Sequence, residues 1–363
     1  MTRPLADKGL AVLGIESSCD ETAAAVVAGT AVRSSVVATQ HDLHAEYGGV
    51  VPEIASRAHV ERMSPVIGRA LAEAGTDWQD LDAIAVGHRP GLIGSLLIGV
   101  AAARGIAWAR GLPLIGVDHV HAHLSAGLLG RETGTLETPS LGLVVSGGHS
   151  SIYLIEDPLS PERLGGTIDD AVGEAFDKAA AILGLPHPGG PAIDALASRE
   201  GADDRALDLP VSRLGRESLD FSFSGLKTAL LYAVRGKPRP RAEGGGFERD
   251  HTSLSDQQRR DAAASFQRAA SQAVTLKLRR SIEHVRSRGL RPRTLVAGGG
   301  VTANSRLRRE LSELCQAESL TLMIPEPRYC VDNAAMIALL GSLRLAAGHR
   351  DELDLAPVPT TAC

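Results

Sequence analysis

The pattern of hydrophobic and polar residues predicts two hairpins, one near the start of the chain and one near its middle. Residues 10–27 (LAVLGIESSCDETAAAVV) and 140–155 (SLGLVVSGGHSSIYLI) are apolar runs, each interrupted by a short turn of small and polar residues. Two apolar runs joined by such a turn are typical of an antiparallel hairpin. Similar hairpins at the start of two halves indicate a duplicated lobe with a cleft between the copies.

Helical periodicity fills much of the remaining chain. Apolar residues recur with helical spacing over 59–74, 171–183 and 256–288, and 294–311 predicts a strand, a glycine turn and a helix. Strands that alternate with helices indicate the α/β class. By contrast, 235–253 (RGKPRPRAEGGGFERDHTS) is rich in Pro, Gly and charge, which predicts a mobile surface insertion outside the core.

Composition narrows the class further. The 363 residues can form two lobes with a sizeable core, and 44% hydrophobic with 22% charged residues is ordinary for a soluble globular protein. Four widely spaced cysteines without a C-x-x-C pair indicate reduced thiols. The first residues lack a signal-peptide pattern, and the longest apolar stretch, 90–103, is too short to span a bilayer. We therefore expect a cytoplasmic protein with no membrane partner.

Three glycine-rich turns are candidates for phosphate binding. VSGGHS (145–150) follows an apolar run, AGGGVTAN (297–304) precedes a predicted helix, and HPGGPAID (187–194) ends in Asp194, which could bind a ribose. Glycine lets backbone N–H groups approach an anion, and a helix N-terminus favours negative charge. An ordinary tight turn explains each one alone, whereas three together favour a nucleotide cleft. The chain contains no P-loop and no G-x-G-x-x-G after a strand.

Three histidines crowd the stretch GVDHVHAHL (116–124). On a helix, residues four apart lie on one face, with Cβ atoms roughly 5–6 Å apart. His119 and His123 can therefore bind one ion while His121 points nearly the opposite way; a helix with exposed histidines is the alternative. A zincin needs Glu directly after the first histidine, and Val120 stands there, so a metalloprotease is disfavoured.

Carboxylates in the first hairpin are candidates for acid–base chemistry. Asp20 and Glu21 lie in its turn, where either could accept a proton or simply cap local N–H groups. Glu16 is a weaker candidate, because strand alternation can turn it away from the cleft. Lys227 contacts either a ligand or only solvent.

Nine motifs occur in an order that resembles the universal tRNA N6-adenosine threonylcarbamoyltransferase family, once called O-sialoglycoprotein endopeptidases. They are GIESSCDET, HAEYGGVVPEIASRAHVE, VDHVHAHL, VVSGGHS, IDDAVGEAFDKAA, PGGP, DFSFSGLKT, GGGVTAN and CVDNAAMIA. The resemblance covers about residues 10–345.

The resemblance implies an α/β actin-like, sugar-kinase-like ATPase (ASKHA) fold, in which two duplicated ribonuclease-H-like lobes surround a nucleotide cleft. We expect residues 8–130 with 328–350 to form the first lobe, and 131–327 the second, which contains the insertion. Residues 351–363 are expected to form a tail.

The implied reaction moves the threonylcarbamoyl group of threonylcarbamoyl-AMP to the exocyclic amine of adenosine 37, in tRNAs that read codons beginning with A. The implied partners are this tRNA, an inactive paralogue and a P-loop ATPase, and the implied cofactor is one divalent metal ion, iron or zinc. The main alternative is a small-metabolite kinase or ATPase of the same superfamily. Phosphoryl transfer there normally relies on magnesium and carboxylates, which the histidines argue against.

The resemblance also assigns site residues. Its metal ligands are His119, His123 and Asp332. Its adenylate-binding residues are Val144, Val145, Ser146, Gly147, Gly148, Asp177, Gly190, Asp194 and Asn304.

Two departures and one basic cluster complete the picture. His88-Arg89-Pro90-Gly91 stands where the family has small-Gly-Pro-Gly, and Gly298 replaces an alanine, which we expect to be a minor change. The net charge of −5 and 3% aromatic residues leave only local patches for nucleic acid. Candidate phosphate contacts are the arginines of 235–249 and a cluster at 277–309 of Lys277, Arg279, Arg280, Arg286, Arg288, Arg291, Arg293, Arg306, Arg308 and Arg309.

Overall fold

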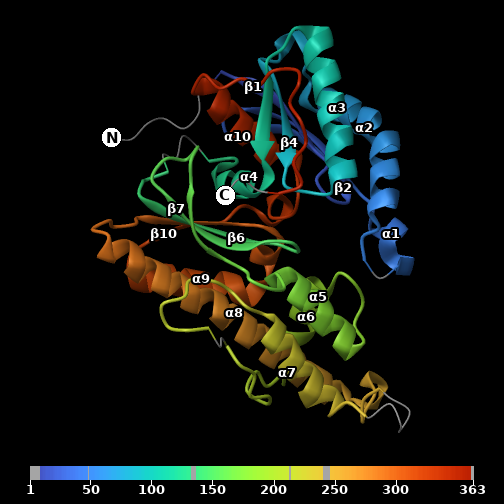
Figure 1. Cartoon of the computed structure of the whole chain (residues 1–363), viewed down its shortest axis with the longest axis vertical. Coiled ribbons are helices and arrows are strands. Elements are labelled where there is room, and N and C mark those ends of the chain that lie inside the picture. The colour runs from blue at the N-terminus through green and yellow to red at the C-terminus, as the bar shows by residue number, and fades with distance from the viewer. Residues whose placement is uncertain (1–8, 48, 132–135, 212–213, 240–245, 361–363) are drawn as a thin grey trace.

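The computed structural model describes residues 9–47, 49–131, 136–211, 214–239 and 246–360. Over these residues it contains two five-stranded mixed sheets, one in each lobe (Figure 1). The first sheet has the order β3-β2-β1-β4-β5, with β1 Ala11–Glu16, β2 Glu21–Ala28, β3 Ala31–Thr39, β4 Ala83–Arg89 and β5 Leu114–Asp118. The second has the order β10-β9-β6-β7-β8, with β6 Ser140–Val145, β7 Ser150–Ile155, β8 Glu162–Gly166, β9 Thr294–Gly298 and β10 Thr321–Met323.

The two sheets share one topology. In each, the first three strands form an antiparallel meander, and the fourth and fifth strands are added in parallel beside the first. Both predicted hairpins are present, as β1–β2 and β6–β7. The same order of pairing in both lobes agrees with a duplicated unit.

Helices cover the outer faces of the sheets and fill the space between them. The first-lobe helices are α1 His41–His44, α2 Pro52–Ala74, α3 Ile93–Arg110, α4 His119–Ser125 and α10 Ala334–Ala346. The second-lobe helices are α5 Val172–Leu183, α6 Gly189–Ala197, α7 Ser224–Arg235, α8 Asp256–Ser287 and α9 Ser305–Glu318. The helices predicted at 59–74, 171–183 and 256–288 are confirmed within α2, α5 and α8.

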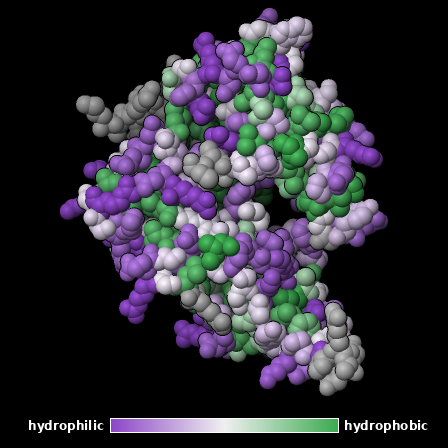
Figure 2. All heavy atoms as spheres, in the orientation of Figure 1, coloured by the Kyte–Doolittle hydropathy of each residue, from purple (hydrophilic) through white to green (hydrophobic). Residues whose placement is uncertain are grey.

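Alternation along the strands divides the core into three layers. One face of the first sheet packs against α2 and α3, and its other face packs against α10. In β6, Leu143 and Val145 face the cluster of α5 and α8, whereas Val144 faces the central layer with α4 and α10. The helix α4 therefore lies between the two sheets, near the notch between the lobes that Figure 2 displays.

The C-terminal segment packs on the first lobe. Asp351 pairs with Leu114 at the edge of β5, and its carboxylate accepts a hydrogen bond from Gly116 N at 2.8 Å. Val358 N donates to His88 O at 2.9 Å. The expected tail is thus attached along its described part.

The charged insertion has order at its base. Arg239 N donates to Gly246 O at 2.9 Å, and Pro238 and Phe247 form an antiparallel bridge. Residues 240–245 of this segment lie outside the described residues. The two flanks of the insertion are therefore paired with each other, and the mobility of 235–253 stays a prediction.

The helix α3 corrects one expectation from the sequence. It runs on to Arg110, so it is long and apolar enough to cross a membrane by length and composition alone. Of its 18 residues, 33% are buried inside the protein. It packs against β4, β1 and α2. Three of the four cysteines are described, and all three are free thiols.

Candidate metal and nucleotide sites

The helix α4 positions two histidines at the junction of the lobes. Asp118, the last residue of β5, caps this helix by accepting hydrogen bonds from Val120 N at 3.0 Å and His121 N at 3.2 Å. His119 and His123 then lie one turn apart on one face, with ring centroids 4.8 Å apart. Both side chains are almost fully buried.

Asp332 meets both histidines from the other end of the chain. Its Oδ1 lies 3.4 Å from His119 Nε2 and 3.1 Å from His123 Nε2. It stands two residues before α10, whose N-cap Asn333 accepts a hydrogen bond from Met336 N at 3.0 Å. The candidate ligand atoms of His119, His123 and Asp332 all lie within 4.8 Å of one another. The sequence-predicted trio is therefore assembled in one place.

Glu16 supports this trio from β1. Its Oε2 lies 3.0 Å from His119 Nδ1, and Ser18 Oγ lies 3.2 Å from the same nitrogen. Glu16 is fully buried. The expectation that alternation turns Glu16 away is wrong, because the side chain of Glu16, at the end of β1, faces His119 of α4.

The charges in this cluster are strongly coupled. Burial lowers the pKa of His119, but Glu16 and Asp332 outweigh it and raise the pKa well above its usual value. Burial raises the pKa of Asp332, but His119 and His123 outweigh it and hold the pKa well below its usual value. Burial lowers the pKa of His123. Two imidazoles and a carboxylate that converge in this way are a donor set for a divalent transition metal.

His121 is on the other side of α4. Its ring packs edge-on against Tyr153, with centroids 5.7 Å apart, and has no contact with Asp332 among the described residues. The prediction that His119 and His123 share one face of the helix while His121 points away is thus consistent with the geometry.

Asp20 and Glu21 form a second polar group at the start of β2. His41 Nε2 lies 3.4 Å from Glu21 Oε1 and 3.9 Å from Asp20 Oδ2. Burial, with the nearby charges of Asp332 and Asp20, raises the pKa of Glu21 to about 7, although His41 opposes this rise. A carboxyl with such a pKa is suited to exchange protons near neutral pH. His59, which the sequence did not single out, anchors this turn by hydrogen-bonding Cys19 O at 3.0 Å.

The first glycine turn lies beside the histidines. Ser146 N donates to His149 O at 2.8 Å, and His149 N donates to Ser146 Oγ at 3.1 Å, which closes the turn. Gly147 and Gly148 are exposed, and a Cβ on either would meet nothing within 4 Å. The strand β6, which leads into this turn, packs on α4, and burial together with the charges of His119 and His123 lowers the pKa of His149 to about 4.

The strand residues before that turn offer little to a ligand. Val144 and Val145 have fully buried side chains, and both pair with β7. Val144 also pairs with Gly298 of β9. Among the described residues of this turn, the backbone N–H groups of Gly147 and Gly148 are therefore the donors that remain available to a ligand.

The remaining nucleotide candidates lie around α5, α6 and α9. Asp177 accepts a hydrogen bond from Gly189 N at 2.7 Å at the start of α6, where Gly190 has open space above its Cα. Asp194 and Asn304 are joined by Gln267, whose Nε2 lies 2.8 Å from Asp194 Oδ1 and 3.3 Å from Asn304 Oδ1.

Asn304 has a structural role and one unused donor. Its Oδ1 caps α9 by accepting a hydrogen bond from Leu307 N at 3.0 Å. Its Nδ2 is buried without a hydrogen-bond partner among the described residues. An unsatisfied buried donor is costly unless a ligand or water accepts its hydrogen bond.

The basic cluster is mostly paired within the fold. Lys277 is 1% exposed and donates to Ser218 O at 2.7 Å, so its assignment as a phosphate contact is wrong. Arg288 forms two bonds to Glu162, and Arg286 pairs with Glu318 at 2.7 Å. Lys227, which was left open, lies 3.2 Å from Asp170. These partners were invisible in the sequence because they come from distant segments.

Both departures from the family pattern have structural consequences. At the first departure, Arg89 Nε lies 3.2 Å from Asp118 Oδ2, and His88 Nδ1 lies 3.2 Å from Ala356 O. A Cβ at Gly298 would overlap His123 O. The exchange at Gly298 therefore touches the metal-site helix directly, and the expectation of a minor change does not hold.

Comparison with known proteins agrees with this arrangement. A family model described as tRNA N6-adenosine threonylcarbamoyltransferase matches residues 31–339. A relative of that name from Sorangium cellulosum (strain So ce56) is 47% identical over 97% of this chain and 96% of its own. One from Pelobacter propionicus (strain DSM 2379 / NBRC 103807 / OttBd1) is 48% identical over 95% of each. The crystal structure of T. kodakarensis HypF, 15% identical, superposes with a TM-score of 0.57 over 94% of this chain and 48% of that one.

The fold and site together define a two-lobed α/β protein of the actin-like, sugar-kinase-like class, as predicted. Within that class, the chain belongs to the tRNA N6-adenosine threonylcarbamoyltransferase family. The predicted resemblance and the predicted enzyme class, a transferase, are thereby confirmed.

Proposed function

We propose that this protein transfers a threonylcarbamoyl group from threonylcarbamoyl-AMP to the exocyclic amine of adenosine 37 in tRNAs that read codons beginning with A. The observation that carries the proposal is the assembly of His119, His123 and Asp332 beside an open glycine turn, in a chain of this family. A site for an acyl-adenylate needs both parts, one for the acyl oxygens and one for the phosphate.

We further propose that His119, His123 and Asp332 hold one divalent metal ion, iron or zinc. When bound, such an ion supplies Lewis acidity toward the donor's oxygen atoms. The chain itself orients its ligands: Glu16 fixes the ring of His119, and the cap Asp118 fixes the start of α4. The two imidazoles set this donor set apart from a magnesium site for phosphoryl transfer.

The adenylate is proposed to lie across the glycine turns. The N–H groups of Gly147 and Gly148 would receive its phosphate, since no side chain obstructs their approach. Asp177, Gly190, Asp194 and the unused amide donor of Asn304 would contact the nucleoside. Held there, the donor has a fixed orientation toward the metal ligands, which lowers the entropic part of the barrier.

The proton of the attacking amine is proposed to pass to Glu21. An exocyclic amine gives up a proton as its nitrogen bonds to carbon, and a carboxylate must be near to accept it. The pKa of Glu21 is raised to about 7, so this carboxyl is suited to take up a proton near neutral pH. Asp20 is the neighbouring alternative and also raises the pKa of Glu21.

The partners are proposed from the family resemblance: tRNA, an inactive paralogue and a P-loop ATPase. Exposed candidates for tRNA phosphates in the basic cluster include Arg279, Arg291 and Arg293, of which Arg293 lies 3.7 Å from Glu137. A cytoplasmic location is part of the same proposal.

Nucleoside mass spectrometry tests the function. Unmodified tRNA is incubated with this protein, the two partner proteins, threonine, bicarbonate and ATP, and is then digested. The expected result is threonylcarbamoyladenosine that disappears when this protein is omitted. Phosphorylation of a small metabolite without modified tRNA would instead identify a kinase of the same superfamily.

A further inference from the structure

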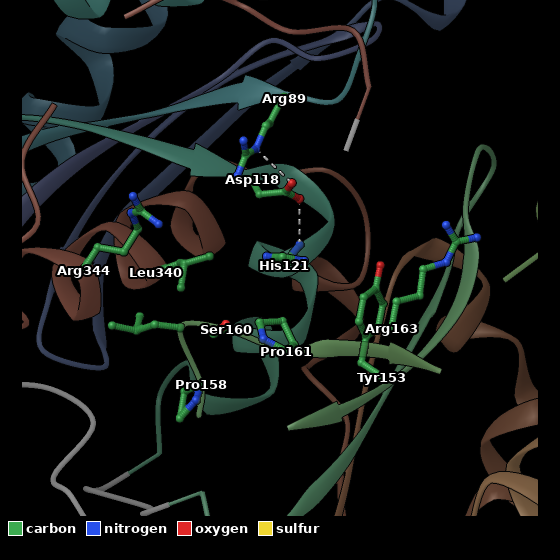
Figure 3. Close-up of a pocket in the computed structure, with 11 residues that line it drawn as sticks. Arg89, Asp118, His121, Tyr153, Pro158, Ser160, Pro161, Arg163, Leu340 and Arg344 are labelled. Atoms are coloured by element: carbon green, nitrogen blue, oxygen red, sulfur yellow. Dashed lines mark hydrogen bonds and ion pairs between the residues drawn. The ribbon is translucent and has the colours of Figure 1, made fainter. Parts of the chain in front are cut away.

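A cavity of about 250 Å³ lies on the side of α4 opposite the metal ligands. Its first wall comes from the first lobe, with Arg89 of β4, Asp118 of β5, His121 of α4 and Arg344 of α10. Its second wall comes from the β7–β8 hairpin of the second lobe, with Tyr153 and Arg163. Figure 3 shows these side chains around one space, with Arg344 and Tyr153 on opposite sides.

The charges around this space are unbalanced. Three arginines line it, against the single carboxylate of Asp118. Its Oδ2 lies 3.2 Å from Arg89 Nε and its Oδ1 caps α4, so this carboxylate offsets the charge of Arg89 and leaves Arg163 and Arg344 without a counter-charge in the cavity lining. Burial lowers the pKa of His121, with a further contribution from the nearby positive charges of Arg89 and Arg344. The cavity therefore has a net positive wall.

Arg344 carries one of the two arginine Nε groups in this cavity lining that are buried without a hydrogen-bond acceptor among the described residues. Among the described residues, no carboxylate lies within ion-pair distance of it, and its Nε is buried without a hydrogen-bond acceptor. A guanidinium presents five N–H donors in a planar fork that matches the oxygens of phosphate or carboxylate groups. A buried donor that has no acceptor in the fold is well placed to receive one from a ligand.

We propose that this cavity binds a compact phosphate group, either free phosphate or the phosphate of a small metabolite. Its volume is below the roughly 300–1,000 Å³ of sites for drug-sized ligands, so a compact anion fits and a nucleotide does not. Arg344 and Arg89 supply the charge, and Tyr153 lines the same space from the second lobe. Arg89 belongs to the turn in which this sequence departs from its family pattern.

The site lies between elements of both lobes that also share the central hydrophobic layer. Its walls belong to both lobes, so a bound anion holds the β7–β8 hairpin against α10 and β4. Arg89 also contacts Asp118, the cap of the helix that carries His119 and His123. Occupancy of the cavity therefore stabilises the arrangement of the lobes around α4.

Calorimetric titration of the full-length protein with inorganic phosphate, at constant ionic strength, tests the proposal. The wild-type protein is expected to bind phosphate saturably, and Arg344→Gln is expected to weaken this at least tenfold, since it removes a charge-assisted hydrogen bond. The matched control is Arg350→Gln, an exposed arginine near the same helix end. Thermal unfolding without phosphate checks that Arg344→Gln is folded, and the rise in Tm that phosphate causes in the wild type should be absent in it.

Two further arms separate this site from the proposed active site and define the ligand. Gly147→Val should retain wild-type phosphate affinity if the cavity is the site. Unchanged affinity in Arg344→Gln together with lost affinity in Gly147→Val, or no phosphate binding in the wild type, would overturn the proposal. Titration with glycerol 3-phosphate distinguishes the sources: tighter binding than phosphate indicates a phosphorylated metabolite, and weaker binding indicates the free ion.

Discussion

Glu16 and His119 are 103 residues apart in the sequence and form a hydrogen bond, with Glu16 Oε2 3.0 Å from His119 Nδ1. The bond leaves Nε2 of the same ring directed at Asp332. Histidines that ligate metals usually donate their other ring N–H to a carboxylate or carbonyl, which fixes the tautomer and the ring plane. Glu16 is thus a positioning residue for the proposed metal ligand.

Replacing Glu16 by Gln should weaken metal binding while leaving all three ligands in place. Loss of such an outer partner typically lowers metal affinity about 10–100-fold. Competition with a chromophoric chelator measures this affinity directly. Glu53→Gln, an exposed glutamate at the start of α2, is the control. Equal metal affinities for the two variants would show that Glu16 does not position a metal ligand and only stabilises the metal-free fold.

Metal analysis of alanine variants should distinguish His119 and His123 of α4, which are proposed ligands, from His121, which is not. His119→Ala, His123→Ala and Asp332→Ala each remove one ligand atom from a cluster that spans 4.8 Å, so each should lose bound metal and transferase activity. His121→Ala removes a ring that packs on Tyr153 and should keep most of both. Metal retained in the His119 variant and lost in the His121 variant would reverse the assignment.

How much the sequence predicts depends on how far the relevant partners lie along the chain. The spacing of His119 and His123 defines a shared helix face, so their pairing is predictable from local geometry alone. Asp332 required the family resemblance, because nothing local relates it to α4. Glu16 was misjudged for a similar reason: alternation places it on one face of β1 but does not say which element covers that face.

The basic cluster shows the opposite failure. The sequence shows how many arginines lie in one segment but not which carboxylates pair with them. Here Glu162 pairs with Arg288 and Glu318 pairs with Arg286, both from other elements. Lys277 lies on the buried side of α8, where its ammonium group reaches the backbone at Ser218. Charge along one segment therefore overstated the basic surface that is available to RNA.

The stability of the metal-free protein should fall between about pH 4.5 and pH 7 because of Glu21. Burial raises its pKa from 4.5 to about 7, so the folded chain binds more protons than the unfolded chain in this window. That stabilisation is complete below pH 4.5 and is lost as pH rises through 7. His41, whose pKa Glu21 raises, adds in the same direction.

Urea unfolding of the wild type and Glu21→Gln over this pH range measures the effect. The variant should gain stability relative to the wild type as pH rises, whereas Glu46→Gln, an exposed neighbour, should follow the wild type. In the transferase assay, loss of a general base should lower kcat by roughly 10²–10⁴-fold. Parallel pH curves for Glu21→Gln and the wild type would contradict the raised pKa.

Gly147→Val should block the donor without disturbing the fold. A Cβ at this position meets nothing within 4 Å, so the free protein should unfold at an unchanged temperature. The branched side chain would cover the N–H groups that are proposed to receive the phosphate. Calorimetric titration with ATP should therefore show at least a tenfold loss of affinity, and an unchanged affinity would remove this turn from the site.

Gly298→Ala should disturb the metal centre from the second lobe. Gly298 ends β9, and a methyl group there would overlap the carbonyl oxygen of His123, so either α4 or β9 must shift. Overpacking of this kind costs typically about 1–3 kcal/mol. Gly300→Ala is the matched control two residues on, since its methyl group would touch only Val331 Cγ1 at 4.0 Å. Urea unfolding should show a lower stability for Gly298→Ala alone, and metal titration should show weaker binding, because the shift moves His123 relative to Asp332. Wild-type stability and wild-type metal affinity would mean that β9 or α4 shifts to accommodate the methyl group at no measurable cost in free energy.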